Sequence, residues 1–159
     1  MARTDEVMVG DKAPPFELPD QKGDVFRLED ALSRGPLVVF FYPKDETPVC
    51  TAEACSFRDA HEDFVAAGAS IVGISSDGVE SHKRFAARNG LKYPILADAH
   101  GAVRKRFGVP RGLLGLSDGR VTYVIDRHGV VRLRHAAMLQ SSAHMREALE
   151  MVRRLEREV

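Results

Sequence analysis

The chain contains two cysteines, Cys50 and Cys55, in the stretch "PKDETPVCTAEACSFRD". A thiolate is a strong nucleophile, so a close cysteine pair can carry out redox chemistry in a reducing compartment. Two cysteines are too few for a secreted disulfide scaffold. Zinc would need further ligands at metal spacing, and none follows the pair. The residues therefore favour a catalytic or redox-active pair over a metal site.

The residues before Cys50 predict that it lies at the start of a helix. Thr47 supplies a hydroxyl for the N-cap position, and Pro48 suits the first helical position. Cys50 then falls in the first turn, where free N–H groups and the positive end of the helix dipole favour a thiolate. We expect this helix to continue through Val65 and to stop at Gly68. The alternative, an inert cysteine in the core, does not account for this placement or for the second cysteine.

The spacing of five residues separates the two thiols. On an ideal helix, Cα atoms five residues apart are about 8.7 Å from each other. A disulfide tolerates a Cα separation of only about 7 Å. Either Cys50 and Cys55 never bond, or they bond only when the helix between them unwinds.

The elements that must position the pair alternate between short β-rich runs and amphipathic helices, which is typical of an α/β layer fold. The predicted strands are 37–42, 70–75 and 121–126, and a turn at 126–129 into 130–135 predicts an antiparallel hairpin and hence a mixed sheet. Asp77 and Glu80 have capping-box spacing before a helix that ends at Asn89–Gly90. The residues after Asp98 predict another helix, and the last helix is expected to begin near Ser141 or Ser142.

The bulk composition limits the class of protein. The 159 residues suit one domain spanning 1–159, and 23 basic residues balance 23 acidic ones, so nucleic acid is a poor candidate partner. No apolar run is long enough for a signal peptide or a membrane span. We expect a cytoplasmic protein without a membrane partner.

The segment "YPKDETPVCTAEACSFRD" closely resembles the active-site segment of the peroxiredoxins, in the branch called PrxQ or bacterioferritin comigratory protein. The resemblance extends to "VGDKAPPFELPDQKGDVFRLED", "ISSDGVESHKRFAARNGLKYPILAD" and "GRVTYVIDRHGVV". Pro43, Thr47, Cys50 and Arg120 match the family motif. The resemblance implies a thioredoxin-like fold with an N-terminal extension and a central mixed β-sheet flanked by helices, which agrees with the order of the predicted elements.

The family resemblance also implies a function. Cys50 corresponds to the peroxidatic cysteine and Cys55 to the resolving cysteine of a thioredoxin-dependent, atypical 2-Cys peroxiredoxin, an antioxidant enzyme. It would reduce hydrogen peroxide and organic hydroperoxides through a Cys50 sulfenic acid and an intramolecular disulfide, recycled by thioredoxin or another dithiol reductant. No metal or organic cofactor is required. The chain would be a monomer or a weak homodimer.

The resemblance implies roles for four further residues. Thr47 and the first-turn amides would hydrogen-bond the peroxide, Arg120 would supply fixed positive charge, and Pro43 would shield the pocket from water. Glu53 matches an acidic residue that orients the arginine.

Two alternative functions use the same fold. A thiol–disulfide oxidoreductase is disfavoured because the chain has no Cys-x-x-Cys motif. A redox-sensing binding protein would use the cysteines as a switch that exposes apolar surface. The scattered histidines are interpreted as helix or turn residues without a catalytic role: His61, His82, His100, His128, His135 and His144.

Overall fold

A mixed five-stranded sheet forms the centre of the computed structural model, which describes residues 6–109, 119–137 and 141–158. The strand order is β5-β4-β3-β6-β7. The strands are β3 (Leu37–Phe41), β4 (Ser70–Ser75), β5 (Ile95–Ala97), β6 (Val121–Ile125) and β7 (Val131–Ala136). β3 runs parallel to β4 and antiparallel to β6, while β7 completes the predicted hairpin with β6. The strand β5 was not predicted, because its three residues are too few for a clear pattern.

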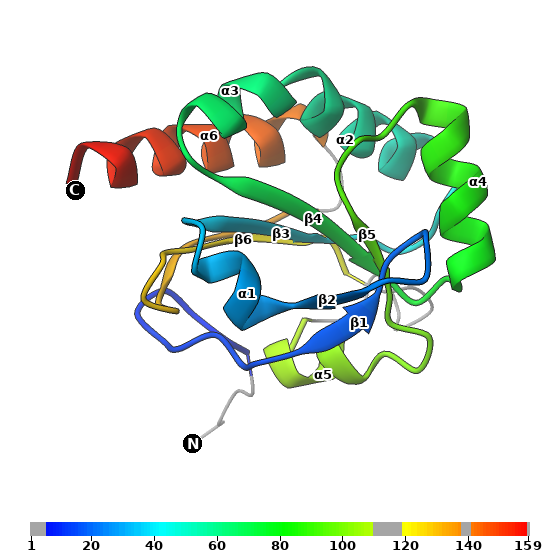
Figure 1. Cartoon of the computed structure of the whole chain (residues 1–159), viewed down its shortest axis with the longest axis horizontal. Helices are drawn as coiled ribbons and strands as arrows, with labels where there is room; N and C mark the ends of the chain where they lie inside the picture. The colour runs from blue at the N-terminus through cyan, green and yellow to red at the C-terminus, as the bar shows by residue number, and fades with distance from the viewer. Residues whose placement is uncertain (1–5, 110–118, 138–140, 159) are drawn as a thin grey trace.

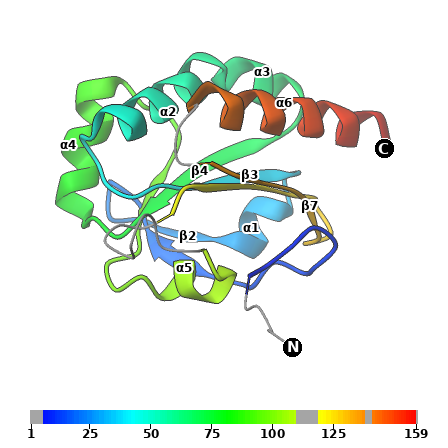
Figure 2. The same ribbon diagram turned by 180° about the vertical axis from the view of Figure 1, so that it is seen from behind.

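Helices cover both faces of this sheet (Figures 1 and 2). One face carries α2 (Pro48–Asp59), α3 (His61–Ala66) and α6 (Ser141–Glu158), with α4 (Val79–Asn89) near the β5 edge. The opposite face carries the N-terminal extension, which consists of the hairpin β1 (Glu17–Pro19) and β2 (Val25–Arg27) and the short helix α1 (Leu28–Leu32). Helix α5 (Ala102–Phe107) packs beside it. The layers are those of the expected α/β fold.

The alternation of side chains along β3 produces two apolar cores. Val38 and Phe40 point toward the α2 and α6 layer, whereas Leu37, Val39 and Phe41 point toward α1 and α5. All five side chains are buried. The strand that leads to Cys50 is therefore held on both faces.

Helix α2 is anchored to the sheet through aromatic packing. The ring of Phe57 stacks on that of Phe40, with centroids 4.6 Å apart. Gly73 of β4 makes room for this stack, because a Cβ atom there would lie 2.8 Å from the Phe40 ring. Full burial of a phenylalanine contributes roughly 1.5–3 kcal/mol. The stack therefore fixes the later turns of α2 and leaves its first turn to other contacts.

The single helix predicted from Thr47 to Val65 is wrong, because the chain forms two helices that break at Ala60. This residue has φ −94° and ψ 3°, outside the helical region. The break keeps both Phe57 and Phe64 fully buried, with ring centroids 5.8 Å apart. An apolar pattern that continues through one non-helical residue does not reveal the break.

The predicted capping box of α4 is also wrong. Gly78 occupies the N-cap position, and no side chain caps the helix. Asp77 cannot serve as the cap because its Oδ2 accepts hydrogen bonds from the Asp45 amide and the Ser75 hydroxyl. The predicted end of this helix is confirmed, with Gly90 in the left-handed region.

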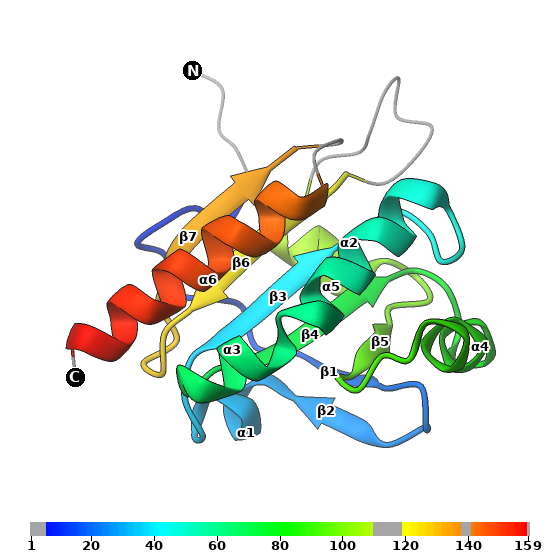
Figure 3. The same cartoon turned by 90° about the horizontal axis from the view of Figure 1, so that it is seen from above.

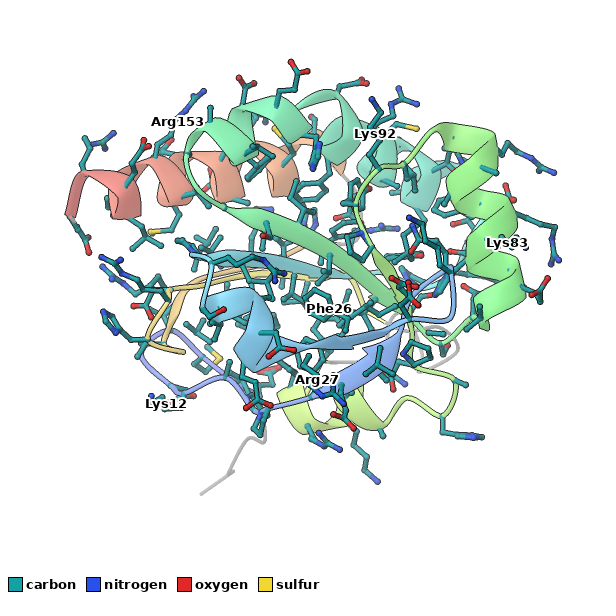
Figure 4. The ribbon with its side chains drawn as sticks, in the orientation of Figure 1. Lys12, Phe26, Arg27, Lys83, Lys92 and Arg153 are labelled. Carbon is teal, nitrogen blue, oxygen red and sulfur yellow. The ribbon has the colours of Figure 1, made fainter. Side chains whose placement is uncertain are left out.

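The remaining helix predictions agree with the structure. Asp98 accepts bonds from the amides of Val103 and Arg104 at the entry to α5, and the last helix begins at Ser141. Lys83, Lys92 and Arg153 lie on the outer surface of the helical layers (Figure 4). No helix in the described part of the chain is long and apolar enough to cross a bilayer.

Candidate active site

Cys50 lies in the first turn of α2, as predicted. Thr47 occupies the N-cap position and Pro48 begins the helix. Cys50 is only 1% exposed, and both cysteines are free thiols. The first-turn N–H groups and the helix dipole therefore act on a sulfur that is almost completely removed from water.

Arg120, immediately before β6, connects Cys50 to Glu53. Its Nη2 lies 3.2 Å from Cys50 Sγ, and its Nη1 donates to Glu53 Oε1 at 2.6 Å. Burial alone would lower the pKa of Arg120, but Glu53 and Cys50 together raise it, so the guanidinium stays charged. Arg120, which was predicted from the family motif alone, is thus in direct contact with the reactive sulfur.

Glu53 is fully buried, and only one of its two carboxylate oxygens accepts a hydrogen bond within the part of the chain that the structure describes. Its Oε1 accepts from Arg120, while Oε2 has no hydrogen-bond partner among the described residues. Burial raises the pKa of Glu53 to about 7, against the lowering effect of the guanidinium. The predicted supporting residue is therefore in place, next to the arginine.

The Thr47 side chain does not make the expected capping bond. Its hydroxyl donates to the Lys44 carbonyl at 3.0 Å and closes the turn before the helix. This bond uses the hydroxyl proton and leaves oxygen lone pairs that can accept a hydrogen bond. Pro43 is half-buried in the same loop, directly after Tyr42.

The turn that carries Thr47 contains a strained residue. Glu46 has φ 68°, the only positive φ at a non-glycine position in the described part of the chain. The left-handed conformation costs such a residue roughly 1–2 kcal/mol. The loop must therefore be held by neighbouring contacts.

Asp45 supplies these contacts through a buried polar cluster. Its Oδ1 accepts from Tyr42 Oη at 2.6 Å, and its Oδ2 accepts from Ser81 Oγ at 2.8 Å and lies 2.7 Å from His82 Nδ1. Its amide donates to Asp77. Because Ser81 and His82 belong to α4, the cluster ties the loop before Cys50 to that helix.

His82 of the Asp45 cluster has no ring nitrogen free to bind a metal ion. Asp45, Asp77 and His82 place one ligand atom each within 4.8 Å of one another. However, His82 Nδ1 is bonded to Asp45, and its Nε2 lies 2.9 Å from the Leu96 carbonyl. Both ring nitrogens face acceptors, so the arrangement is a hydrogen-bonded brace.

Cys55 lies on the same continuous helix and faces away from the arginine contact. It is half-buried, and its Sγ lies 3.7 Å from Asn89 Oδ1 of α4. The preceding carbonyl, that of Ala54, accepts from Tyr93 Oη at 2.7 Å. The structure brings Arg120 and Glu53 to Cys50 but does not bring Cys55 into that group.

The structure adds a residue that sequence reasoning missed, His144 of α6. Its ring is fully buried, and its Nδ1 lies 3.4 Å from Glu53 Oε2. A signal was present, because His144 precedes Ala148 by four residues and so falls on the apolar stripe of α6. The ring nitrogens of a histidine at such a position must find hydrogen-bond partners inside the protein.

A cysteine in the first turn of the helix that follows a central strand, with a charged arginine on its sulfur, is the arrangement of a reactive thiol and defines a thiol-based redox site. Residues 9–134 match the model of the AhpC/TSA family. The chain belongs to this family.

Individual relatives agree with the family match. The chloroplastic peroxiredoxin Q of Sedum lineare is 46% identical over 150 residues, which cover 94% of this chain and 80% of the relative. The structure of peroxidoxin BcpB from Mycobacterium tuberculosis is 44% identical with a TM-score of 0.88, covering 94% of this chain and 99% of that one. With these relatives, the chain is a peroxiredoxin, a thiol peroxidase with two cysteines.

A more distant solved structure has the same fold. The bacterioferritin comigratory protein of Xanthomonas campestris is 29% identical with a TM-score of 0.80, covering 89% of this chain and 92% of that one. It is described as having alkyl peroxide reduction activity. The predicted thioredoxin-like fold and membership of the PrxQ branch are thus confirmed.

Proposed function

We propose that Cys50 is the peroxidatic cysteine and Cys55 the resolving cysteine of this peroxidase. The observation that carries the assignment is the contact of 3.2 Å between Arg120 Nη2 and Cys50 Sγ. The Cys50 thiolate attacks a peroxide oxygen, the O–O bond breaks, and Cys50 becomes a sulfenic acid. The released alkoxide or hydroxide takes up a proton and leaves as alcohol or water.

The residues around Cys50 provide what this attack requires. Arg120 stabilises the thiolate and the negative charge that develops on the leaving oxygen. Thr47, whose own proton is donated to the Lys44 carbonyl, can accept the peroxide O–H and orient it for in-line attack. Pro43 limits access of water from the loop side.

Resolution requires a local opening of α2. The Cys50 sulfenic acid condenses with the Cys55 thiol, which forms the disulfide and releases water. The two Cα atoms must come within about 7 Å, so the helix between the cysteines must unwind. The Tyr93 bond to Ala54 and the Phe57 stack hold the later turns, so the opening is confined to the start of α2.

The substrate and reductant follow from this cycle. Hydrogen peroxide and organic hydroperoxides are the substrates, and thioredoxin or another dithiol reductant reduces the disulfide. A steady-state assay with thioredoxin, its reductase and several peroxides tests this proposal. Peroxide-dependent consumption of reducing equivalents is expected. Insulin reduction without peroxide consumption would instead identify a thiol–disulfide oxidoreductase.

Cys55→Ser separates the two halves of the cycle. We expect this variant to complete its first peroxide turnover at the wild-type rate, because Cys55 does not contact Arg120 or Glu53 in the reduced form. Without a resolving thiol, it is recycled slowly by thioredoxin and is more readily oxidised to sulfinic acid. Rapid-mixing kinetics measure the first step, and mass spectrometry measures the overoxidised product.

Peptide mapping of the peroxide-treated wild type is the control for the Cys55 assignment. A Cys50–Cys55 disulfide within one chain is expected. A Cys50–Cys50 bond between chains, with Cys55 left as a free thiol, would contradict it.

We further propose that residues 1–159 form one domain, that the chain is a monomer or a weak homodimer, and that it acts in the cytoplasm. Cytoplasmic location stays a prediction, since the plant relatives are named as chloroplastic.

A further inference from the structure

Glu53 of α2 and His144 of α6 lie next to each other in the interior of the protein, beside Arg120. Both side chains are 0% exposed, and Glu53 Oε2 lies 3.4 Å from His144 Nδ1. Figure 3 shows the beginning of α6 lying beside α2, which brings the two residues together. None of the roles assigned above uses His144.

The hydrogen bonds of His144 determine which ring nitrogen carries the proton. Nε2 lies 2.8 Å from the carbonyl oxygen of Ala137, which can only accept, so Nε2 is the N–H donor. Burial lowers the pKa of His144 to about 4; the bond to Ala137 opposes this, while His135 and Arg120 add to it. The ring is therefore neutral at neutral pH, and Nδ1 presents a lone pair. Thr122 Oγ1, 2.8 Å away, donates to it.

Oε2 of Glu53 lies 3.4 Å from the same nitrogen, whose lone pair already accepts from Thr122. An ionised carboxylate oxygen and an unprotonated ring nitrogen would repel each other in a buried space. A protonated carboxyl is neutral and removes this repulsion. Burial, which raises the pKa of Glu53 to about 7, favours this protonated form.

We propose that Glu53 is protonated on Oε2, the oxygen that lies next to Nδ1 of His144, and that His144 is thereby a positioning residue for Arg120. This inference rests on the proposed roles of Cys50 and Arg120. The proton leaves Oε1 free to accept from Arg120 Nη1 and removes the negative charge of the carboxylate. The positive charge of Arg120 then acts on the Cys50 thiolate.

The balance of charge explains why the proton matters. Arg120 carries one positive charge and contacts two acidic groups, at 2.6 Å to Glu53 and 3.2 Å to Cys50. If both were ionised, the site would hold a net buried negative charge, and the thiolate would compete with the nearer carboxylate. With Glu53 neutral, the guanidinium and the thiolate form a balanced pair.

Other titratable or charged groups near Glu53 and His144 also affect the titration of Glu53, and they come from several neighbouring elements. His135 of β7 packs edge-on against His144, with ring centroids 4.6 Å apart. Tyr93 faces Glu53 from the segment before β5, and its pKa is raised by burial and then by Glu53, so it stays neutral. The titratable or charged neighbours are Cys50, Arg120, Tyr93 and His135.

The test follows the rate constant for Cys50 oxidation by hydrogen peroxide as a function of pH. In the wild type the rate is expected to rise with the thiolate fraction and to fall again when Glu53 loses its proton. Glu53→Gln keeps an oxygen for Arg120 but cannot ionise, so the falling limb is expected to disappear. His144→Asn can donate an N–H to Oε2 and so favour the ionised carboxylate, which moves the falling limb to lower pH.

The decrease in the oxidation rate constant caused by His144→Asn depends on how far the falling limb moves along the pH axis. At a pH above both limbs, each unit of displacement lowers the rate constant about tenfold. His100→Asn, at an exposed histidine before α5, is the matched control and is expected to retain the wild-type profile. A falling limb that persists in Glu53→Gln, or that does not move in His144→Asn, would overturn the inference.

Infrared spectroscopy tests the proton without reference to activity. The infrared spectrum of the reduced wild type, after subtraction of the Glu53→Gln spectrum at about pH 6, should show the carbonyl band of a protonated, buried carboxyl group. Asp59→Asn, which removes an exposed carboxylate, should not show it. Absence of the band refutes the inference and leaves the proposed function intact. Normal peroxide turnover in Cys50→Ser would refute the proposed function and leave the band unaffected.

Discussion

Cys50→Ser is expected to lose peroxide reduction, falling to the rate of the uncatalysed reaction. The proposed attack needs a thiolate, and a serine hydroxyl at ordinary pH is almost entirely protonated and far less nucleophilic. Arg120 and the first turn of α2 would still be present, but they would act on a group that cannot attack the O–O bond. We expect a loss on the order of 10³-fold or more in thioredoxin-dependent turnover.

The control for Cys50→Ser is the same substitution at the other cysteine. Cys55→Ser removes an equal amount of sulfur from the same helix, yet it should retain the first turnover. Thermal unfolding of both variants checks that the buried hydroxyl at position 50 has not unfolded the chain. Substantial turnover by a folded Cys50→Ser protein would show that another group attacks the peroxide.

Arg120→Lys is expected to slow Cys50 oxidation by about 10²- to 10³-fold, the usual effect of removing one donor that stabilises transition-state charge. Arginine reaches Glu53 and Cys50 with two different nitrogens, and lysine has only one. The charge is retained, so the loss reflects geometry. Stopped-flow kinetics give the rate constant, and alkylation at several pH values gives the thiolate fraction. The rate loss should exceed what the change in thiolate fraction explains.

Arg132→Lys is the matched control for Arg120→Lys. Arg132 is also paired with acidic side chains, Asp126 and Glu158, but it lies at the opposite end of the β6–β7 hairpin. Its replacement should leave the oxidation rate unchanged. If Arg120→Lys oxidised as fast as Arg132→Lys, the bridge from Arg120 to the sulfur would not be needed for catalysis.

The strands β3, β4 and β6 could be predicted because their apolar runs are buried on both faces. The run predicted at 37–42 forms β3 over Leu37–Phe41, with all five side chains buried, and the turn at 126–129 produced the expected hairpin. The ends of the helices were harder to predict. The periodicity of apolar residues continues past a single residue whose backbone is not helical. Ala60 is such a residue, and so the predicted helix was too long.

The candidate site was predictable where chemistry constrains a short segment. Thr47, Pro48 and Cys50 could be placed at the start of a helix from local rules alone. Arg120 could be assigned only from the motif, since it is 70 residues from Cys50 and no local pattern connects them. The Asp45 brace and His144 depend on contacts between distant elements, and their residue types are common on protein surfaces.

The order in which the ribosome delivers the site residues has a consequence for biosynthesis. Cys50 and Glu53 emerge long before Arg120, and His144 arrives only with α6. Contacts across such sequence separations form late in folding, since the intervening chain must first be closed. In a growing chain Cys50 therefore lacks its arginine and behaves as an ordinary thiol. Reactivity toward peroxide is expected to appear only after Arg120 has been synthesised and folded against Cys50, which protects the thiol from oxidation before the fold can resolve it. Alkylation of arrested nascent chains of increasing length would measure when the thiol becomes reactive, and high reactivity before Arg120 emerges would argue against this order.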